Sequence, residues 1–82
     1  MDNNELTILR GSAAEELLSN EAFITCVNAL YNGYFEEITS SPLDAKEKRE
    51  QRFLQIRALQ DISTELRSWV QAKDLLLTPT EE

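Results

Sequence analysis

The chain has 82 residues, which is enough for one small domain and no more. It is 41% hydrophobic and carries a net charge of −7, so it is typical of a folded acidic protein rather than of a disordered segment or a general DNA-binding protein. It has no histidine, and its one cysteine, Cys26, excludes an internal disulfide and a cysteine-based zinc site.

The chain begins with a stretch that shows no clear periodicity, and we expect residues 1–11 to be a loose lead-in without a secretory signal. Ser12 and Glu15 then match a capping box, in which the cap hydroxyl accepts a hydrogen bond from a free backbone amide of the first turn. A helix is therefore predicted to start at residue 12. The Ser19–Asn20 pair leaves open whether 12–20 form a separate short helix, with Asn20 as the N-cap of the next one.

A long amphipathic helix over about 12–39 is predicted from apolar residues that recur every three or four positions. These are Phe23, Val27, Leu30, Tyr34 and Ile38, and Tyr31 and Phe35 widen the stripe. We expect Cys26 to be a small core residue of this helix. Gly33 interrupts it, either as a tolerated defect or as a point where another helix approaches closely.

A second long helix is predicted over about 43–76, because Ser41–Pro42 and Asp44 both match helix starts and no breaker follows before Thr78–Pro79. Residues 78–82 are expected to be a frayed tail. The fold class is all-α: one helical domain over 12–77, built as an antiparallel hairpin of two long helices.

Two helices cover each other on one side only, and such a hairpin rarely has enough core to stand alone. The apolar stripes are wider than one seam needs, so we expect the hairpin to form a homo-oligomer, with coiled-coil-like packing between copies. The candidate interface residues are Phe53, Ile56, Leu59, Ile62, Leu66, Trp69, Val70, Leu76, Tyr31, Tyr34 and Phe35.

Four basic residues form a candidate contact patch at the start of the second helix: Lys46, Lys48, Arg49 and Arg52. Cations oppose the helix dipole at this end, so they gain nothing locally from being there. Three interpretations are open: a solvated or salt-bridged face, a contact with a protein partner, and a contact with nucleic acid. The last is not expected, because no aromatic residue lies among these bases to stack on a nucleotide.

The sequence offers no catalytic constellation. Histidine, the commonest general base and metal ligand, is absent, and no phosphate-binding loop occurs. The acidic pairs Glu15–Glu16 and Glu36–Glu37 diverge by about 100° on a helix and cannot share a proton or a metal. We expect no enzyme activity, no cofactor, no metal and no membrane span.

The strings AAEELLSNEAF and SPLDAKEKREQRF, followed by a helix with a Leu/Ile seam, resemble short helical proteins encoded by tailed bacteriophages. The resemblance covers about residues 13–70 and is carried by the following positions: Ala13, Ala14, Leu17, Leu18, Asn20, Phe23, Pro42, Asp44, Arg49 and Glu50. It implies a phage setting and a non-enzymatic role, and it transfers no site residues.

Three functions follow as expectations. The first is a self-associating structural or assembly factor of a virion, which contacts copies of itself and other phage or host proteins in the host cytoplasm or the virion. The second is a DNA-packaging factor that binds DNA as a ring, similar to small terminase subunits. The third is an acidic inhibitor of a host nucleic-acid-binding protein, with carboxylates that imitate phosphates: Glu15, Glu16, Glu21, Glu36 and Glu37.

Overall fold

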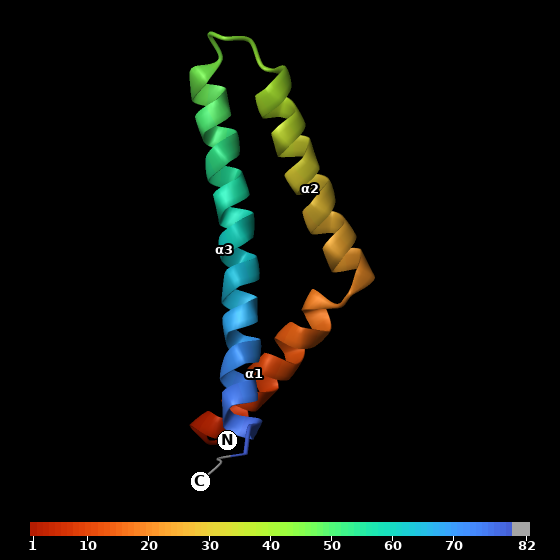
Figure 1. Cartoon of the computed structure of the whole chain (residues 1–82), viewed down its shortest axis with the longest axis vertical. Coiled ribbons are helices and arrows are strands. Elements are labelled where there is room, and N and C mark those ends of the chain that lie inside the picture. The colour runs from red at the N-terminus through yellow and green to blue at the C-terminus, as the bar shows by residue number, and fades with distance from the viewer. Residues whose placement is uncertain (80–82) are drawn as a thin grey trace.

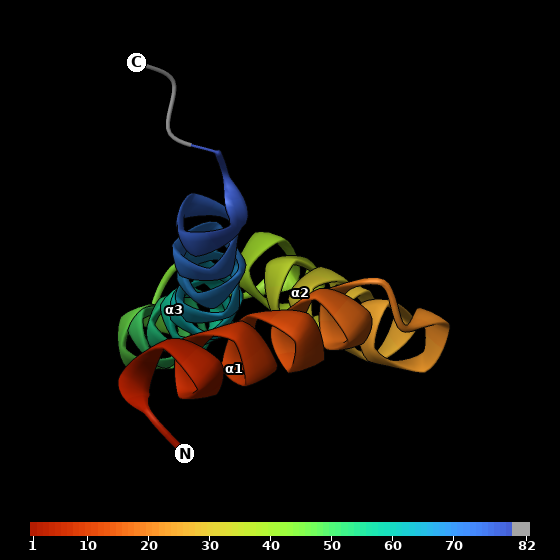
Figure 2. The same ribbon diagram turned by 90° about the horizontal axis from the view of Figure 1, so that it is seen from below.

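A computed structural model describes residues 1–79, and they form three helices and no strand. The helices are α1 (Asn3–Leu18), α2 (Glu21–Ser40) and α3 (Lys46–Leu77). Figure 1 shows α2 and α3 running in opposite directions from a loop at one end of the molecule, while α1 lies across the other end of α3. The end view of Figure 2 shows α1 crossing α3 at a wide angle rather than continuing the line of α2. The all-α prediction is confirmed, but the helices number three.

Helix α1 begins much earlier than the sequence predicted, so the expected loose lead-in over 1–11 is wrong. Asp2 is its N-cap, and the Asp2 Oδ1 accepts a hydrogen bond of 2.7 Å from the Glu5 amide. A carboxylate at this position satisfies a free amide and complements the positive helix end. Ser12 and Glu15 lie inside α1, so the capping box predicted there does not form.

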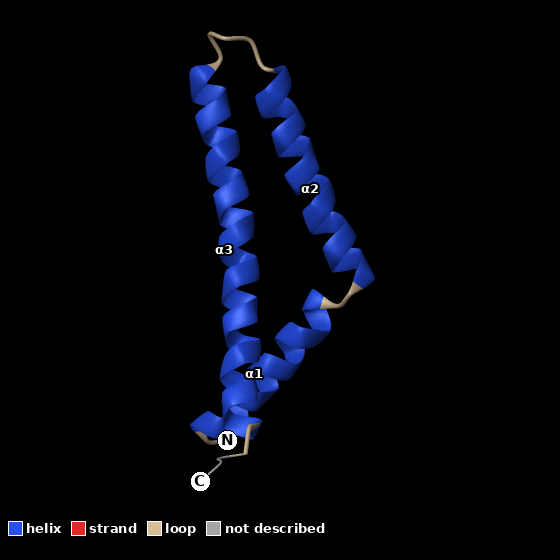
Figure 3. Cartoon of the chain, in the orientation of Figure 1, coloured by secondary structure: helices blue, strands red, loops and turns tan. Residues whose placement is uncertain are grey.

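Helix α2 begins where the sequence indicated a weak point. The Asn20 side chain accepts a hydrogen bond of 2.9 Å from the Phe23 amide, which confirms Asn20 as an N-cap. On the other side of the break, the Ser19 hydroxyl donates to the Glu15 carbonyl at 2.8 Å and so satisfies the end of α1. Of the two possibilities left open for 12–39, the structure has the one with a separate helix before residue 20, as the loop at 19–20 in Figure 3 shows.

Helix α3 starts at Lys46, a few residues later than the predicted 43, and ends at Leu77. Neither Ser41 nor Asp44 caps it: the N-cap position is Ala45, without a side-chain hydrogen bond. Thr78 and Pro79 follow the helix as expected, while the rest of the predicted tail lies outside the described residues. With 32 residues, α3 is about 48 Å long and is the axis on which the other two helices pack.

On α2 and α3, the residues with reduced solvent exposure form a narrow line that faces the neighbouring helix. On α3 the less exposed residues follow one line at steps of three and four, and α2 contributes a matching line that includes Phe23, Val27 and Tyr34. Cys26 is exposed, which corrects the core prediction, because it lies about 100° around the helix from Val27. Among residues 1–79, only the apolar side chains of Ala14 and Ile56 are buried.

The molecule is extended for its size. Its radius of gyration is 17.7 Å and its principal extents are 59 × 26 × 24 Å. A compact domain of this length has a radius of gyration of about 12 Å. Three helices that meet at the ends of one rod do not enclose a common core.

Candidate interaction surface

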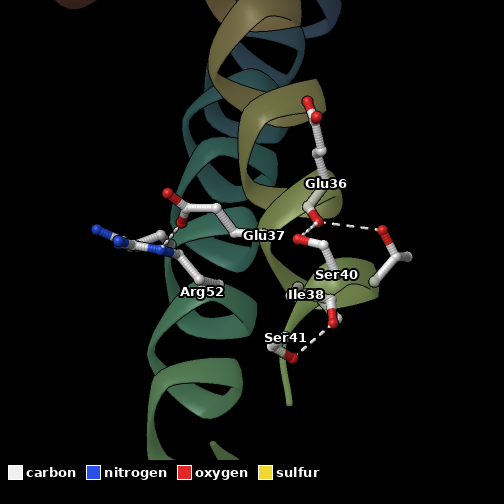
Figure 4. A network of polar contacts seen from close by, with 8 residues as sticks. Glu36, Glu37, Ile38, Ser40, Ser41 and Arg52 are labelled. Atoms are coloured by element: carbon white, nitrogen blue, oxygen red, sulfur yellow. Dashed lines mark hydrogen bonds and ion pairs between the residues drawn. The ribbon is translucent and has the colours of Figure 1, made fainter.

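The first part of the candidate surface is the end of the molecule where α2 meets α3. Arg52 reaches from α3 to form an ion pair with Glu37 of α2, and its guanidinium lies over the Tyr34 ring, 5.7 Å from the centroid. Figure 4 shows this pair beside the last turn of α2, where the Ser40 and Ser41 hydroxyls donate to the Glu36 and Ile38 carbonyls. Arg52 therefore joins two helices of the same chain.

Arg49 has a similar internal role at the loop. Its guanidinium donates to the Ser41 hydroxyl at 3.2 Å and to the Leu43 carbonyl at 3.0 Å, and it also contacts the Pro42 carbonyl. The planar group with several donors suits such a set of acceptors, which a lysine could not span. The side chain thus fixes the path of the chain from α2 into α3.

The predicted basic patch is not brought together as one surface. Arg49 and Arg52 are engaged inside the chain, while Lys46 and Lys48 are exposed and take part in no ion pair among the described residues. Two positions apart on a helix, Lys46 and Lys48 point to opposite sides. This arrangement agrees with the salt-bridged interpretation for Arg52 and with the solvated one for Lys46 and Lys48, whereas Arg49 is held by neutral oxygens of the loop.

An apolar groove of about 620 Å³ lies between the two helices near this end. Tyr31 and Phe35 line it from α2, with ring centroids 5.1 Å apart and an interplanar angle of 43°. From α3 it is lined by Phe53 and Leu54, which are 53% and 70% exposed. Both side chains are large and apolar, so their exposure costs free energy unless something covers them.

The polar edge of the groove is held in place by a bond between helices. The Gln60 Nε2 donates a hydrogen bond of 2.8 Å to the Tyr31 hydroxyl. This contact fixes the aromatic pair of α2 against α3. Sequence reasoning placed Tyr31, Phe35 and Phe53 in the candidate interface but missed Leu54, because it stands outside the three-and-four spacing of the seam. The adjacent pair Phe53–Leu54, apolar around almost a third of the helix, was the available signal.

The predicted seam of α3 separates into two groups. Ile56, Leu59, Leu66 and Val70 face the other helices and are buried or half-buried. A second group flanks them on one side and is more exposed: Ile62 at 53%, Trp69 at 37% and Leu76 at 44%. One helix with apolar residues on both an inner line and a flank has more apolar surface than one neighbour covers.

At the other end of α3, helix α1 makes a close crossing that sequence reasoning missed. A Cβ atom built on Gly11 would lie 2.3 Å from the Lys73 Cβ and 2.8 Å from the Trp69 carbonyl oxygen. Gly11 and Ala14 are the buried residues of α1, and Lys73 forms an ion pair with Glu15 beside them. Gly33, where a close approach was considered, has nothing within 4 Å of such a Cβ.

Among residues 1–79 no three His, Cys, Asp or Glu side chains are placed to share a metal ion. Of the five carboxylates considered as phosphate mimics, Glu15 and Glu37 are paired with Lys73 and Arg52. None of the three helices, over the part of the chain that is described, has a stretch long and apolar enough to cross a membrane.

Comparison of the chain with models of protein families, with curated proteins and with solved structures gave no match.

Proposed function

We propose that this chain is a non-enzymatic helical protein that associates with copies of itself and acts through protein–protein contacts. The unit that presents the contact surface is the antiparallel pair of α2 and α3, with α1 bracing the far end of α3. Its role is that of a structural or assembly factor. The phage virion setting draws on the resemblance of residues 13–70 to short phage proteins.

The observation that carries this proposal is the amount of surface the chain leaves exposed. A compact folded monomer of 9.4 kDa exposes about 5,000 Å², whereas this chain exposes 6596 Å². The surplus of about 1,600 Å² is twice the roughly 800 Å² that each partner buries in a standard interface. A surplus of that size fits an obligate assembly, in which one chain supplies the core that another lacks.

The two alternative functions have less support. A DNA-binding ring needs the basic patch, but Arg49 and Arg52 are used inside the chain, which leaves Lys46 and Lys48 for phosphates. An acidic inhibitor needs converging carboxylates, but Glu15 and Glu37 are neutralised by internal partners. A ring would bury the exposed apolar residues of α3 between copies as the leading proposal does, whereas an inhibitor that acts as a monomer would leave them exposed.

Solution mass, measured by light scattering after size exclusion over a hundredfold range of concentration, tests the proposal. We expect a defined oligomer that persists at micromolar concentration and dissociates, if at all, only at the lowest concentrations. A monomer across the whole range would refute self-association. Electrophoretic mobility of a DNA duplex at low salt serves as the companion measurement, because a shift lost on adding salt would instead favour the DNA-binding ring.

A further inference from the structure

One side of α3 carries a self-complementary pattern of charge. We define the α3 stripe as six exposed residues: Lys46, Glu50, Phe53, Leu54, Arg57 and Asp61. Their spacing of mostly three or four residues keeps all six within an arc of about 100° on the helix. The stripe lies apart from the inner line of α3 that packs on the other helices.

The stripe is palindromic about the bond between Phe53 and Leu54. Within the stripe, the first charged residues on the two sides of this centre are Glu50 and Arg57, at equal distances from it, while Arg52 lies on another side of the helix and is paired with Glu37. The next are Lys46 and Asp61, also at equal distances, and each pair has opposite signs. A two-fold axis through the centre therefore places every charge of the stripe opposite its counter-charge on the other copy, and each contact occurs twice.

Other arrangements of two copies lack this match. If two α3 helices ran parallel and in register, each charge would face its own copy, and like charges repel. Among the described residues, Lys46 and Glu50 form no ion pair within the chain. Arg57 and Asp61 meet only each other at 3.5 Å, with side chains that are 76% and 69% exposed, so water screens that contact. The charges of the stripe are thus free to face a partner.

The centre of the stripe is also apolar and exposed. Phe53 and Leu54 form one wall of the groove whose other wall is Tyr31 and Phe35 of α2, and Glu50 and Arg57 line its margin. In the two-fold arrangement, Phe53 and Leu54 of one copy face the same pair and the groove of the other. The surplus exposed surface is ample for the area that each partner of a stable dimer buries.

We propose that a second copy of this chain docks on the α3 stripe, with the two α3 helices antiparallel and crossing at Phe53–Leu54, Glu50 facing Arg57 of the other copy and Lys46 facing Asp61. This inference rests on the proposed self-association and specifies its interface. In this dimer, Glu50 and Arg57 fix the register of the two helices through their charges. Phe53 and Leu54 supply most of the affinity, because their apolar side chains become buried.

Charge reversal tests the pairing directly. In Glu50→Arg, two arginines face each other at both ends of the contact, and in Arg57→Glu, two glutamates do so. We expect self-association to weaken about tenfold or more in each single variant. The double variant Glu50→Arg/Arg57→Glu exchanges the two charges, and its dimer affinity should return to near that of the natural chain. Lys48→Glu, on another side of the same helix, is the control and should change the affinity little.

Mixing the two single variants gives the sharpest result. A chain with Arg at 50 and 57 is complementary to a chain with Glu at both positions, so the two should form a heterodimer although neither forms a stable homodimer. Copies that differ in mass by a tag make the heterodimer visible by native mass spectrometry. This experiment also guards against misfolding, because a chain that failed to fold would not be rescued by its complement.

Failure of the proposed self-association and failure of the α3 stripe as its interface give different results. If the natural chain is monomeric at every concentration, the proposed function itself fails. If the natural chain self-associates but the double variant stays as weak as the singles and the mixture yields no heterodimer, the α3 stripe is not the interface and the copies meet elsewhere.

Discussion

Glycine and small residues decide where α1 meets α3. The backbone of α1 approaches α3 so closely at Gly11 that the Trp69 carbonyl would lie 2.8 Å from a Cβ there. This oxygen and the still closer Lys73 Cβ are both fixed to the backbone of a long helix, so neither can rotate aside as a side-chain tip would. Gly33, in the middle of α2, has open space instead. The same residue type thus has a packing function at one position and none at the other.

This contrast predicts opposite effects of one substitution at two sites. Gly11→Ala should destabilise the fold by about 1–3 kcal/mol, because it forces α1 away from α3. Gly33→Ala should stabilise it by up to about 1 kcal/mol, because alanine has the higher helix propensity and meets nothing. Urea unfolding followed by circular dichroism at one fixed protein concentration measures both. Equal shifts in the two variants would mean that α1 does not cross α3 at Gly11.

At the scale of the elements, short capping signals set the ends of α1 and α2 more firmly than periodicity does. Asn20 was recognisable from the sequence because an asparagine preceded an apolar repeat, and its cap forms as expected. Asp2 and Glu5 carry a similar signal, but the absence of an obvious stripe in 3–11 concealed it. The crossing at Gly11 could not be predicted from the sequence, because it depends on residues 58 or more positions away in α3.

The candidate surface, like the helix ends, was predictable from the sequence only in part. The sequence indicated an excess of apolar residues on α3, and the structure leaves many of them exposed. It did not show that Arg49 and Arg52 turn inward, because their partners lie in the loop and in α2. A run of charged residues in the sequence shows which charges are present. The direction in which each side chain points is fixed only when the neighbouring element is in place.

The break between α1 and α2 is held by the Asn20 cap. Asn20→Ala removes the acceptor for the Phe23 amide and should lower stability by about 1 kcal/mol. Asn32→Ala, at an exposed position within α2, is the matched control. It should raise stability by about 0.5 kcal/mol through helix propensity alone. Both are measured by thermal or urea unfolding. A neutral Asn20→Ala would show that the cap does not hold the break in place.

At the scale of the whole molecule, the chain is one long helix with two shorter helices packed on it, and its described residues form only a small core. Only two of its described apolar side chains are buried, while Leu54, Leu75 and Leu77 are between 58% and 72% exposed. Folding stability comes mainly from apolar burial set against conformational entropy. In the proposed assembly, the free energy of folding should therefore depend on the contacts between copies.

In the proposed assembly, folding and association of the chain are coupled. Anything that binds the folded chain and not the unfolded one raises its apparent stability, and a second copy is such a ligand. We expect the Tm to rise continuously with protein concentration, with helix content falling on dilution. Leu54→Asp, at the centre of the α3 stripe, should lower the Tm and flatten its dependence on concentration. Leu43→Asp, at a loop position that is 96% exposed, should leave both unchanged. A Tm that stays constant over a hundredfold dilution, with helix content preserved, would mean that the three helices are stable alone despite their small core.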